Sequence, residues 1–168
     1  HQVRDMLAVY AEPSIDYPGG AGLASHRAAW SAYYHTLGLS IPEDCIIPTL
    51  GASEGMQAAL FVATDPGDEV LVFEPLYIGF KVVASILDCR LVPLSTEFET
   101  TFSLPPVREW EQKITTRTKA IVVINPDNPT GRVLTRAELC TISQFATKHQ
   151  LTLIVDETYR GYTPHFGW

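Results

Sequence analysis

The sequence has few cysteines, few basic residues and no long apolar run, and each shortage excludes a class of protein. Its three cysteines, Cys45, Cys89 and Cys140, are odd in number and widely spaced in apolar stretches. This favours free, buried thiols in a reducing compartment over disulfides or a metal site. Twelve lysines and arginines against nineteen aspartates and glutamates give a net charge of −7, which argues against nucleic acid or an anionic membrane as partner.

No uninterrupted apolar run is long enough to span a bilayer, and the first residues lack the pattern of a signal peptide. We therefore expect a cytoplasmic protein. The composition, with 46% hydrophobic and 18% charged residues, is that of an ordinary globular domain. The chain starts at His1 without an initiator methionine and stops at Trp168, just after a predicted strand, so we expect a fragment of a longer protein.

The most informative stretch runs from Ala120 to Tyr159. Two short β-branched runs, residues 120–124 and 151–155, each precede a polar cluster and are typical of buried strands in a parallel sheet. Between them, Thr135 and Glu138 form a capping box that opens a helix. The predicted unit is a right-handed strand–loop–helix–strand crossover. Its two polar loops leave the same edge of the sheet, where open α/β sheets bind ligands.

The rest of the chain alternates strands and helices, which predicts one α/β unit with three αβα layers and a mostly parallel sheet. Residues 1–38 are expected to be a lead-in and a first helix, and residues 39–168 the alternating core. We predict strands at 45–50, 69–73 and 90–94, and helices at 23–37, 56–63, 78–87 and 105–114. Gly38 should stop the first helix, and Pro93 indicates an edge or an end for its strand.

Small residues follow the first predicted strand, where positions 51–55 read Gly-Ala-Ser-Glu-Gly and open a helix. Such a turn lets backbone N–H groups converge on an anion at the positive end of the helix. A tight turn capped by Ser53 would give the same local structure. The same residues also fit the nucleophile elbow of a hydrolase, with Ser53, Asp156 and His165 in triad order. Asp156 and His165 are too close in sequence for the usual intervening strand and helix, which weighs against the hydrolase.

Two motifs carry a resemblance to a known family. Residues 125–131, Asn-Pro-Asp-Asn-Pro-Thr-Gly, followed by residues 156–159, Asp-Glu-Thr-Tyr, resemble the cofactor-binding core of class I/II aminotransferases, the fold-type-I pyridoxal-phosphate enzymes. The resemblance covers nearly the whole chain. It implies the large domain of that fold, incomplete in this chain, and transamination between an amino acid and a 2-oxo acid in amino acid metabolism. It also implies a homodimer for the complete enzyme.

The resemblance assigns six residues to pyridoxal phosphate: Ala52, Ser53, Tyr77, Asn128, Asp156 and Tyr159. Asp156 would pair with the pyridine nitrogen, whose protonation makes the cofactor a strong electron sink. Asn128 and Tyr159 would donate to the phenolic oxygen, and Tyr77 would supply a flat, rigid partner for the ring face. The start of the helix at Ala52 and Ser53 would hold the phosphate.

Tyr17 and Gly20 lie in a glycine-rich loop that resembles the family's loop reaching into the neighbouring subunit's active site. The sequence around Tyr77 is similar to that of bacterial enzymes acting on aspartate or related amino acids, while the substrate-binding arginine is absent from the chain. The same scaffold serves C–S lyases and decarboxylases, so these reactions remain alternatives to transamination. A non-catalytic fragment or binding module is a further alternative.

The resemblance also implies what the chain does not contain. The Schiff-base lysine of the family follows the strand that ends at Asp156, so we expect it beyond Trp168, together with the phosphate-binding and substrate-binding arginines. The four lysines present have the surroundings of solvated surface groups: Lys81, Lys113, Lys119 and Lys148. We expect no catalytic residue and no metal site in this chain, and no activity from it alone. Two later strands of the family would insert between the strand at 45–50 and the strand at 151–155, so without them the first strand loses its neighbours and we expect the isolated chain to be poorly stable.

Overall fold

The computed structural model describes residues 4, 5 and 19–163, and the chain divides into two compact units, residues 1–49 and 50–168. In the first unit, helix α2 (Ala24–Thr36) is followed by a short 3-10 turn, η1 (Glu43–Cys45). The predicted stop of α2 at Gly38 is confirmed: Gly38 has a φ of +79° and donates its N–H to the His35 carbonyl at 3.0 Å.

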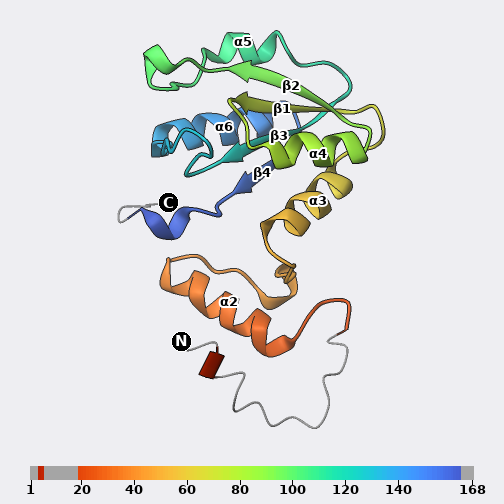
Figure 1. The fold of residues 1–168 in the computed structure, drawn as a ribbon, viewed down its shortest axis with the longest axis vertical. Helices are drawn as coiled ribbons and strands as arrows, with labels where there is room; N and C mark the ends of the chain where they lie inside the picture. Colours follow the sequence, from red (N-terminus) through yellow and green to blue (C-terminus); the bar gives the residue numbers. More distant parts are fainter. Residues whose placement is uncertain (1–3, 6–18, 164–168) are drawn as a thin grey trace. The chain divides into compact units, whose positions relative to one another are not determined.

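The second unit is built on a four-stranded parallel sheet with the order β2-β1-β3-β4 (Figure 1). Its strands are β1 (Glu69–Glu74), β2 (Arg90–Ser95), β3 (Thr118–Ile124) and β4 (Thr152–Asp156). Pro93 lies in β2, at an edge of the sheet, as its sequence predicted. An edge strand tolerates proline because one side of the strand needs no backbone N–H for pairing.

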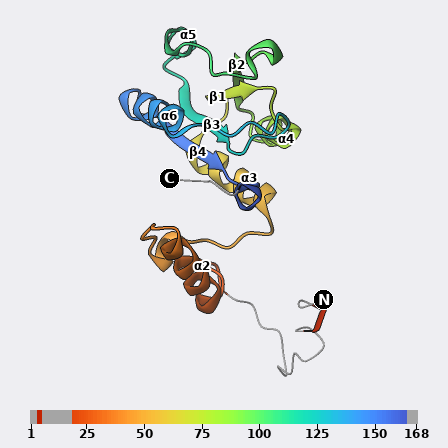
Figure 2. The same cartoon turned by 90° about the vertical axis from the view of Figure 1, so that its left-hand side faces the viewer.

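Helices cover both faces of this sheet, as Figures 1 and 2 show, and confirm the predicted three-layer αβα class. The helices are α3 (Ala52–Ala63), α4 (Ile78–Ile86), α5 (Val107–Glu111) and α6 (Arg136–Lys148). Alternate side chains of a strand point to opposite faces. In β1, Val70 and Val72 therefore pack with α3 and α4, whereas Leu71 packs with α5 and α6. The central strands are buried on both faces, which explains their uninterrupted apolar sequence.

The predicted capping box at the start of α6 is confirmed. The Thr135 N–H donates to the Glu138 carboxylate at 2.9 Å, and the Glu138 N–H donates to Thr135 Oγ1 at 3.3 Å. Glu138 also forms an ion pair with Arg132. Burial acts to raise the pKa of Glu138, but the hydrogen bonds from Thr135 and Arg132 outweigh it and leave the pKa lowered. The carboxylate thus stays ionised and fastens the loop before α6 to the helix.

The strand predicted at residues 45–50 is wrong. Cys45 ends η1, and residues 46–50 belong to no strand. A strand needs a neighbouring backbone to satisfy its N–H and C=O groups. The described sheet is formed by β1 to β4 without this segment, and the two strands expected between this segment and β4 belong to no described part of the chain.

The cysteines are free, as predicted, but only Cys89 is buried. Burial raises the pKa of the Cys89 thiol, which makes it a poor nucleophile. The prediction of burial is wrong for Cys45 and Cys140, which are exposed. Cys140 lies on α6 away from the side that carries the buried Ile142 and Phe145, so an apolar sequence context did not place it in the core.

Glu69 gives the fold a pH dependence. Its side chain is buried at the start of β1, where it forms an ion pair with Arg90 and accepts a hydrogen bond from Thr115 Oγ1 at 2.7 Å. The hydrogen bond from Arg90, and then that from Thr115, lowers the pKa of Glu69 below its ordinary value of 4.5. A carboxylate with a lowered pKa stabilises the fold above its unfolded pKa, and this contribution is lost as the pH falls through the folded value.

We therefore expect the urea midpoint of the protein to fall more between about pH 7 and about pH 3 than that of a Glu69→Gln variant, which has no such proton to bind. Glu99→Gln is the matched control, because Glu99 is exposed. Its pH dependence should equal that of the wild type. Parallel curves for the wild type and Glu69→Gln would show that Glu69 does not contribute.

Candidate functional site

A cavity of about 220 Å³ lies at the carboxyl ends of β3 and β4, the sheet edge to which the sequence pointed. Its lining includes all six residues assigned to the cofactor: Ala52, Ser53, Tyr77, Asn128, Asp156 and Tyr159. Gly51, Met56, Ile124 and Thr158 also line it. Since an apolar cavity of about 150 Å³ can hold a benzene molecule, this space suits one substituted aromatic ring. The fold therefore gathers these predicted site residues from four separate segments into one cavity.

The start of α3 forms one wall of the cavity. Gly51 is the N-cap, with a φ of +78° that favours glycine, and Ala52 and Ser53 are the first two helical residues. Ser53 is therefore not the cap of this helix. The first N–H groups of a helix have no acceptor within the helix, and they lie at its positive end. This wall can bind an anion.

The loop after β3 is fixed to the end of β4 by its first residue, Asn125. Asn125 is 1% exposed, its N–H donates to the Asp156 carbonyl at 2.8 Å, and its Oδ1 accepts from the Leu134 N–H at 2.9 Å. Because Asn125 is buried, breaking these bonds would leave its N–H and its Oδ1 without partners. Asn125 thereby joins the ends of β3 and β4, from which the cavity residues project.

The tip of the same loop is closed by Asp127. Its Oδ2 accepts from the Thr130 N–H at 3.1 Å, and its own N–H donates to the Arg132 carbonyl at 2.8 Å. Asn128 lies within this closed turn, and its Nδ2 donates to the Tyr159 hydroxyl at 3.4 Å. The amide and the phenol thus meet at one point of the cavity wall, although they are 31 residues apart in sequence.

Asp156 places a carboxylate at the end of β4. Its Oδ1 accepts from both the N–H of Thr158, at 3.0 Å, and the hydroxyl of Thr158, at 2.6 Å. Sequence reasoning did not single out Thr158, although Asp followed by Thr at position i+2 is the pattern of a local side-chain turn. The next residue, Glu157, is paired with Arg160 at 3.2 Å. Burial raises the pKa of Glu157, the Arg160 charge opposes this rise, and the Asp156 charge adds to it.

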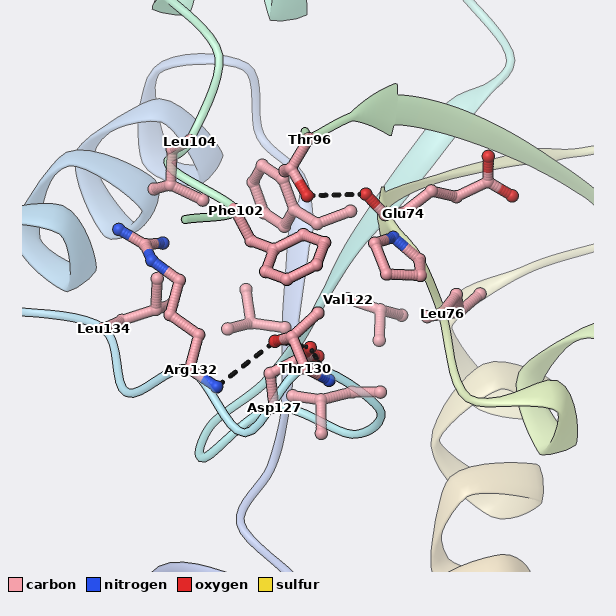
Figure 3. A pocket seen from close by; sticks show the side chains of 14 residues that line it. Glu74, Leu76, Thr96, Phe102, Leu104, Val122, Asp127, Thr130, Arg132 and Leu134 are labelled. Carbon is pink, nitrogen blue, oxygen red and sulfur yellow. Dashed lines mark hydrogen bonds between the residues drawn. The ribbon is translucent and has the colours of Figure 1, made fainter. Parts of the chain in front are cut away.

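A second cavity, of about 40 Å³, is lined in part by Asp127, Thr130 and Arg132 of the loop after β3 (Figure 3). Its lining combines apolar side chains, among them Phe102, Leu104 and Leu134, with the polar Thr130 and Arg132. The Arg132 N–H donates to Thr130 Oγ1 at 3.2 Å. This space is too small for a substituted ring, since a cavity that holds a benzene molecule has about 150 Å³. We interpret it as packing that supports the loop from behind.

Some of the residues singled out in the sequence do not reach the cavity. Tyr17 and His165 lie outside the described residues. Gly20 is exposed in a turn of the first unit that is closed by the bond from the Gly22 N–H to the Gly19 carbonyl, 3.1 Å long. For the hydrolase alternative, Ser53 and Asp156 line one cavity, but the proposed base is not among the described residues.

The four lysines of the chain all lie in its described part, and none of them lines the cavity. Lys81 pairs with Glu74 at 3.2 Å, and Lys148 pairs with Glu111 at 2.6 Å. Lys113 and Lys119 are exposed. Within residues 19–163, no three side chains of His, Cys, Asp or Glu are grouped closely enough to hold a metal ion. The helices that the structure describes include none with the length and apolar character needed to cross a membrane.

Comparison with known proteins connects this cavity to a family. The YugH protein of Bacillus subtilis is 34% identical over 149 residues, which are 88% of this chain and 38% of that protein. The structure of N-succinyldiaminopimelate aminotransferase from Mycobacterium tuberculosis matches with a TM-score of 0.82 and 31% identity over 93% of this chain and 40% of that one. Aspartate aminotransferase from Thermotoga maritima matches with a TM-score of 0.87 and 27% identity, over 99% of this chain and 44% of that one.

The chain therefore spans less than half the length of these relatives. Residues 11–165 match the family described as aminotransferase class I and II. The match covers most of the sequence and includes every residue that lines the cavity. This chain belongs to the class I and II aminotransferase family.

Proposed function

We propose that this chain forms most of the cofactor cradle of a pyridoxal-phosphate-dependent aminotransferase, which transfers an amino group between an amino acid and a 2-oxo acid. The observation that carries the proposal is that all six residues assigned to the cofactor line one cavity at the ends of β3 and β4. Family membership adds support, because the relatives and solved structures named above include aminotransferases.

The chemistry of the cavity wall fits the groups of pyridoxal phosphate. The anion-binding start of α3 suits a dianionic phosphate, and the carboxylate of Asp156 suits a protonated ring nitrogen. The amide of Asn128 and the hydroxyl of Tyr159, 3.4 Å apart, are donors suited to a phenolic oxygen. The ring of Tyr77 is a flat surface suited to an aromatic face. The groups of the cavity wall therefore match the phosphate, the ring nitrogen, the phenolic oxygen and the ring face of the cofactor.

Each residue then has a defined task. When bound, pyridoxal phosphate supplies an electron sink for the breaking of a bond to the substrate Cα. Asp156 holds the proton on the ring nitrogen, and Thr158 fixes the carboxylate by two hydrogen bonds to Oδ1. Asn128 and Tyr159 donate to the phenolic oxygen, and Tyr77 covers one face of the ring.

The proposal extends to the complete protein. The lysine that binds the cofactor covalently is supplied from beyond Trp168, as are the arginines for the phosphate and the substrate carboxylate. The complete enzyme is a cytoplasmic homodimer, in which Tyr17 and Gly20 contribute to the site of the neighbouring subunit. Aspartate is the first amino donor to test, because one structural relative is named as an aspartate aminotransferase.

The test adds pyridoxal phosphate to the purified full-length protein, follows the absorbance of the bound cofactor, and reduces the complex with borohydride before mass spectrometry. We expect one labelled lysine, outside residues 1–168, and formation of glutamate from aspartate and 2-oxoglutarate. Label on Lys81, Lys113, Lys119 or Lys148 would contradict the assignment of the lysine. A cofactor that binds without any amino transfer would instead favour C–S lyase or decarboxylase chemistry on the same scaffold. Absence of cofactor binding would contradict the proposed function itself.

A further inference from the structure

The first turn of α4 contains a glycine that its helical position does not require. Gly79 is the second residue of α4, directly after Ile78, and Tyr77 is the N-cap. Gly79 does not have the positive φ that favours glycine elsewhere in the chain. Glycine weakens a helix relative to alanine because it loses more backbone freedom on folding. The local backbone therefore gives no reason for glycine at this position.

The reason lies in the side chain of Tyr77. A Cβ atom built at Gly79 would collide with Cε1 of the Tyr77 ring, and it would lie 3.0 Å from Cδ1 and 3.1 Å from Cζ. Carbon atoms in favourable contact are about 3.5–4.0 Å apart, so no other residue fits without movement of the ring. The ring therefore lies against the backbone of Gly79. Tyr77 is 37% exposed and lines the cavity.

We propose that Gly79 is a positioning residue, which sets the place of the Tyr77 ring in the cavity and thereby its contact with the bound ring. This inference rests on the proposed function, because that function supplies the aromatic ring on which Tyr77 stacks. Any larger residue at position 79 displaces the ring from the first turn of α4. Displacement removes a stacking contact without removing the ring, the helix or any hydrogen-bonding group of the site.

The test measures the affinity of the full-length protein for pyridoxamine 5′-phosphate by titration calorimetry. This probe has an amine in place of the aldehyde and forms no covalent bond with a lysine. We expect Gly79→Ala to weaken binding by about two- to tenfold, the loss that corresponds to one aromatic contact. The thermal midpoint should be unchanged or higher, since alanine favours a helix more than glycine does.

A double-mutant cycle separates positioning through Tyr77 from any other effect. In a Tyr77→Ala background, Gly79→Ala should change the affinity by less than about 1.5-fold, because no ring remains to be displaced. Equal weakening in both backgrounds, or no weakening in either, would overturn the proposal. Gly161→Ala is the control glycine variant, because a Cβ there meets no atom within 4 Å. Its affinity should equal that of the wild type.

A second measurement needs no cofactor. In the ligand-free protein with selectively labelled glycine, the ring current of Tyr77 should displace the Gly79 resonances, and Tyr77→Ala should abolish this displacement. Gly79 resonances that do not respond to Tyr77→Ala would refute the contact. If pyridoxamine phosphate fails to bind even the wild type, the proposed function is wrong, while the ring-current measurement still decides whether Gly79 holds the Tyr77 ring.

Discussion

Replacing Asp156 by alanine is expected to lower kcat/KM for transamination by the full-length enzyme about 10²- to 10³-fold, the loss typical of one preorganised electrostatic group. The carboxylate at the end of β4 is the anionic side chain among the residues that line the described cavity. Without it, no anionic side chain of the cavity wall is left to pair with the proton on the ring nitrogen. The measurement is steady-state kinetics with aspartate and 2-oxoglutarate.

Two further variants control this result. Asp88→Asn removes the same charge from a turn before β2, at the opposite edge of the sheet, and it should leave kcat/KM unchanged; asparagine also tolerates the φ of 53° at that position. Asp156→Asn keeps the size and the backbone bond to Asn125 and loses only the charge, so it should resemble Asp156→Ala. Full activity of either Asp156 variant, in a protein that folds normally, would remove Asp156 from the proposed mechanism.

Replacing Trp110 by alanine is expected to reduce the free energy of unfolding by about 3–5 kcal/mol, the range for deletion of a buried large aromatic side chain. Trp110 is 1% exposed, and its ring lies edge-on to Phe73 at 5.3 Å and to Phe145 at 5.2 Å between centroids. Its Nε1 donates to the Pro105 carbonyl at 2.9 Å. The variant therefore loses the contacts that fix the short helix α5 on the sheet.

Urea titration followed by circular dichroism measures this loss. Phe61→Ala is the matched control, because Phe61 is 70% exposed on α3, and its effect should stay within about 0.5 kcal/mol. Trp110→Phe should recover part of the stability by keeping an aromatic ring against Phe145. An effect of Trp110→Ala no larger than that of Phe61→Ala would show that α5 does not depend on this packing.

The central crossover was predicted well because its signals are local. The capping box at Thr135 requires only four residues, and the strands on either side are short β-branched runs. Helix ends were predicted less well: α3 starts at Ala52 instead of residue 56, and α5 has five residues instead of the ten expected at 105–114. Both helices start beside a special residue, Gly51 or Pro106, whose effect on the first turn depends on the neighbouring chain.

The strand predicted at 45–50 failed for a different reason. Local sequence shows that a segment is apolar and β-branched, but a strand also needs a partner, and the partner is set by tertiary structure. The exposed Cys140 shows the same limit, because helix periodicity, and not the apolar context, decides which side chain faces the sheet.

The residues of the site were predicted from their motifs and their places at strand ends, and the fold brings them together. The sequence did not predict the neighbouring residues that fix these side chains in position. The two bonds from Thr158 to Asp156 and the close approach of Tyr77 to Gly79 depend on geometry that the motifs do not encode.

The strand order has a consequence for how the site is assembled. β1 lies between β2 and β3. It contacts β3 across a long stretch of sequence: the hydrogen bond from the Thr118 hydroxyl to the Glu69 carboxylate joins residues 49 apart. Such non-local parallel pairings form slowly. During synthesis, β4 leaves the ribosome after the other three strands, and it carries Asp156, the last wall of the cavity. A ligand that binds only the complete cavity therefore stabilises the chain only after β4 has joined the sheet. It shifts the equilibrium toward chains in which β4 is paired with β3.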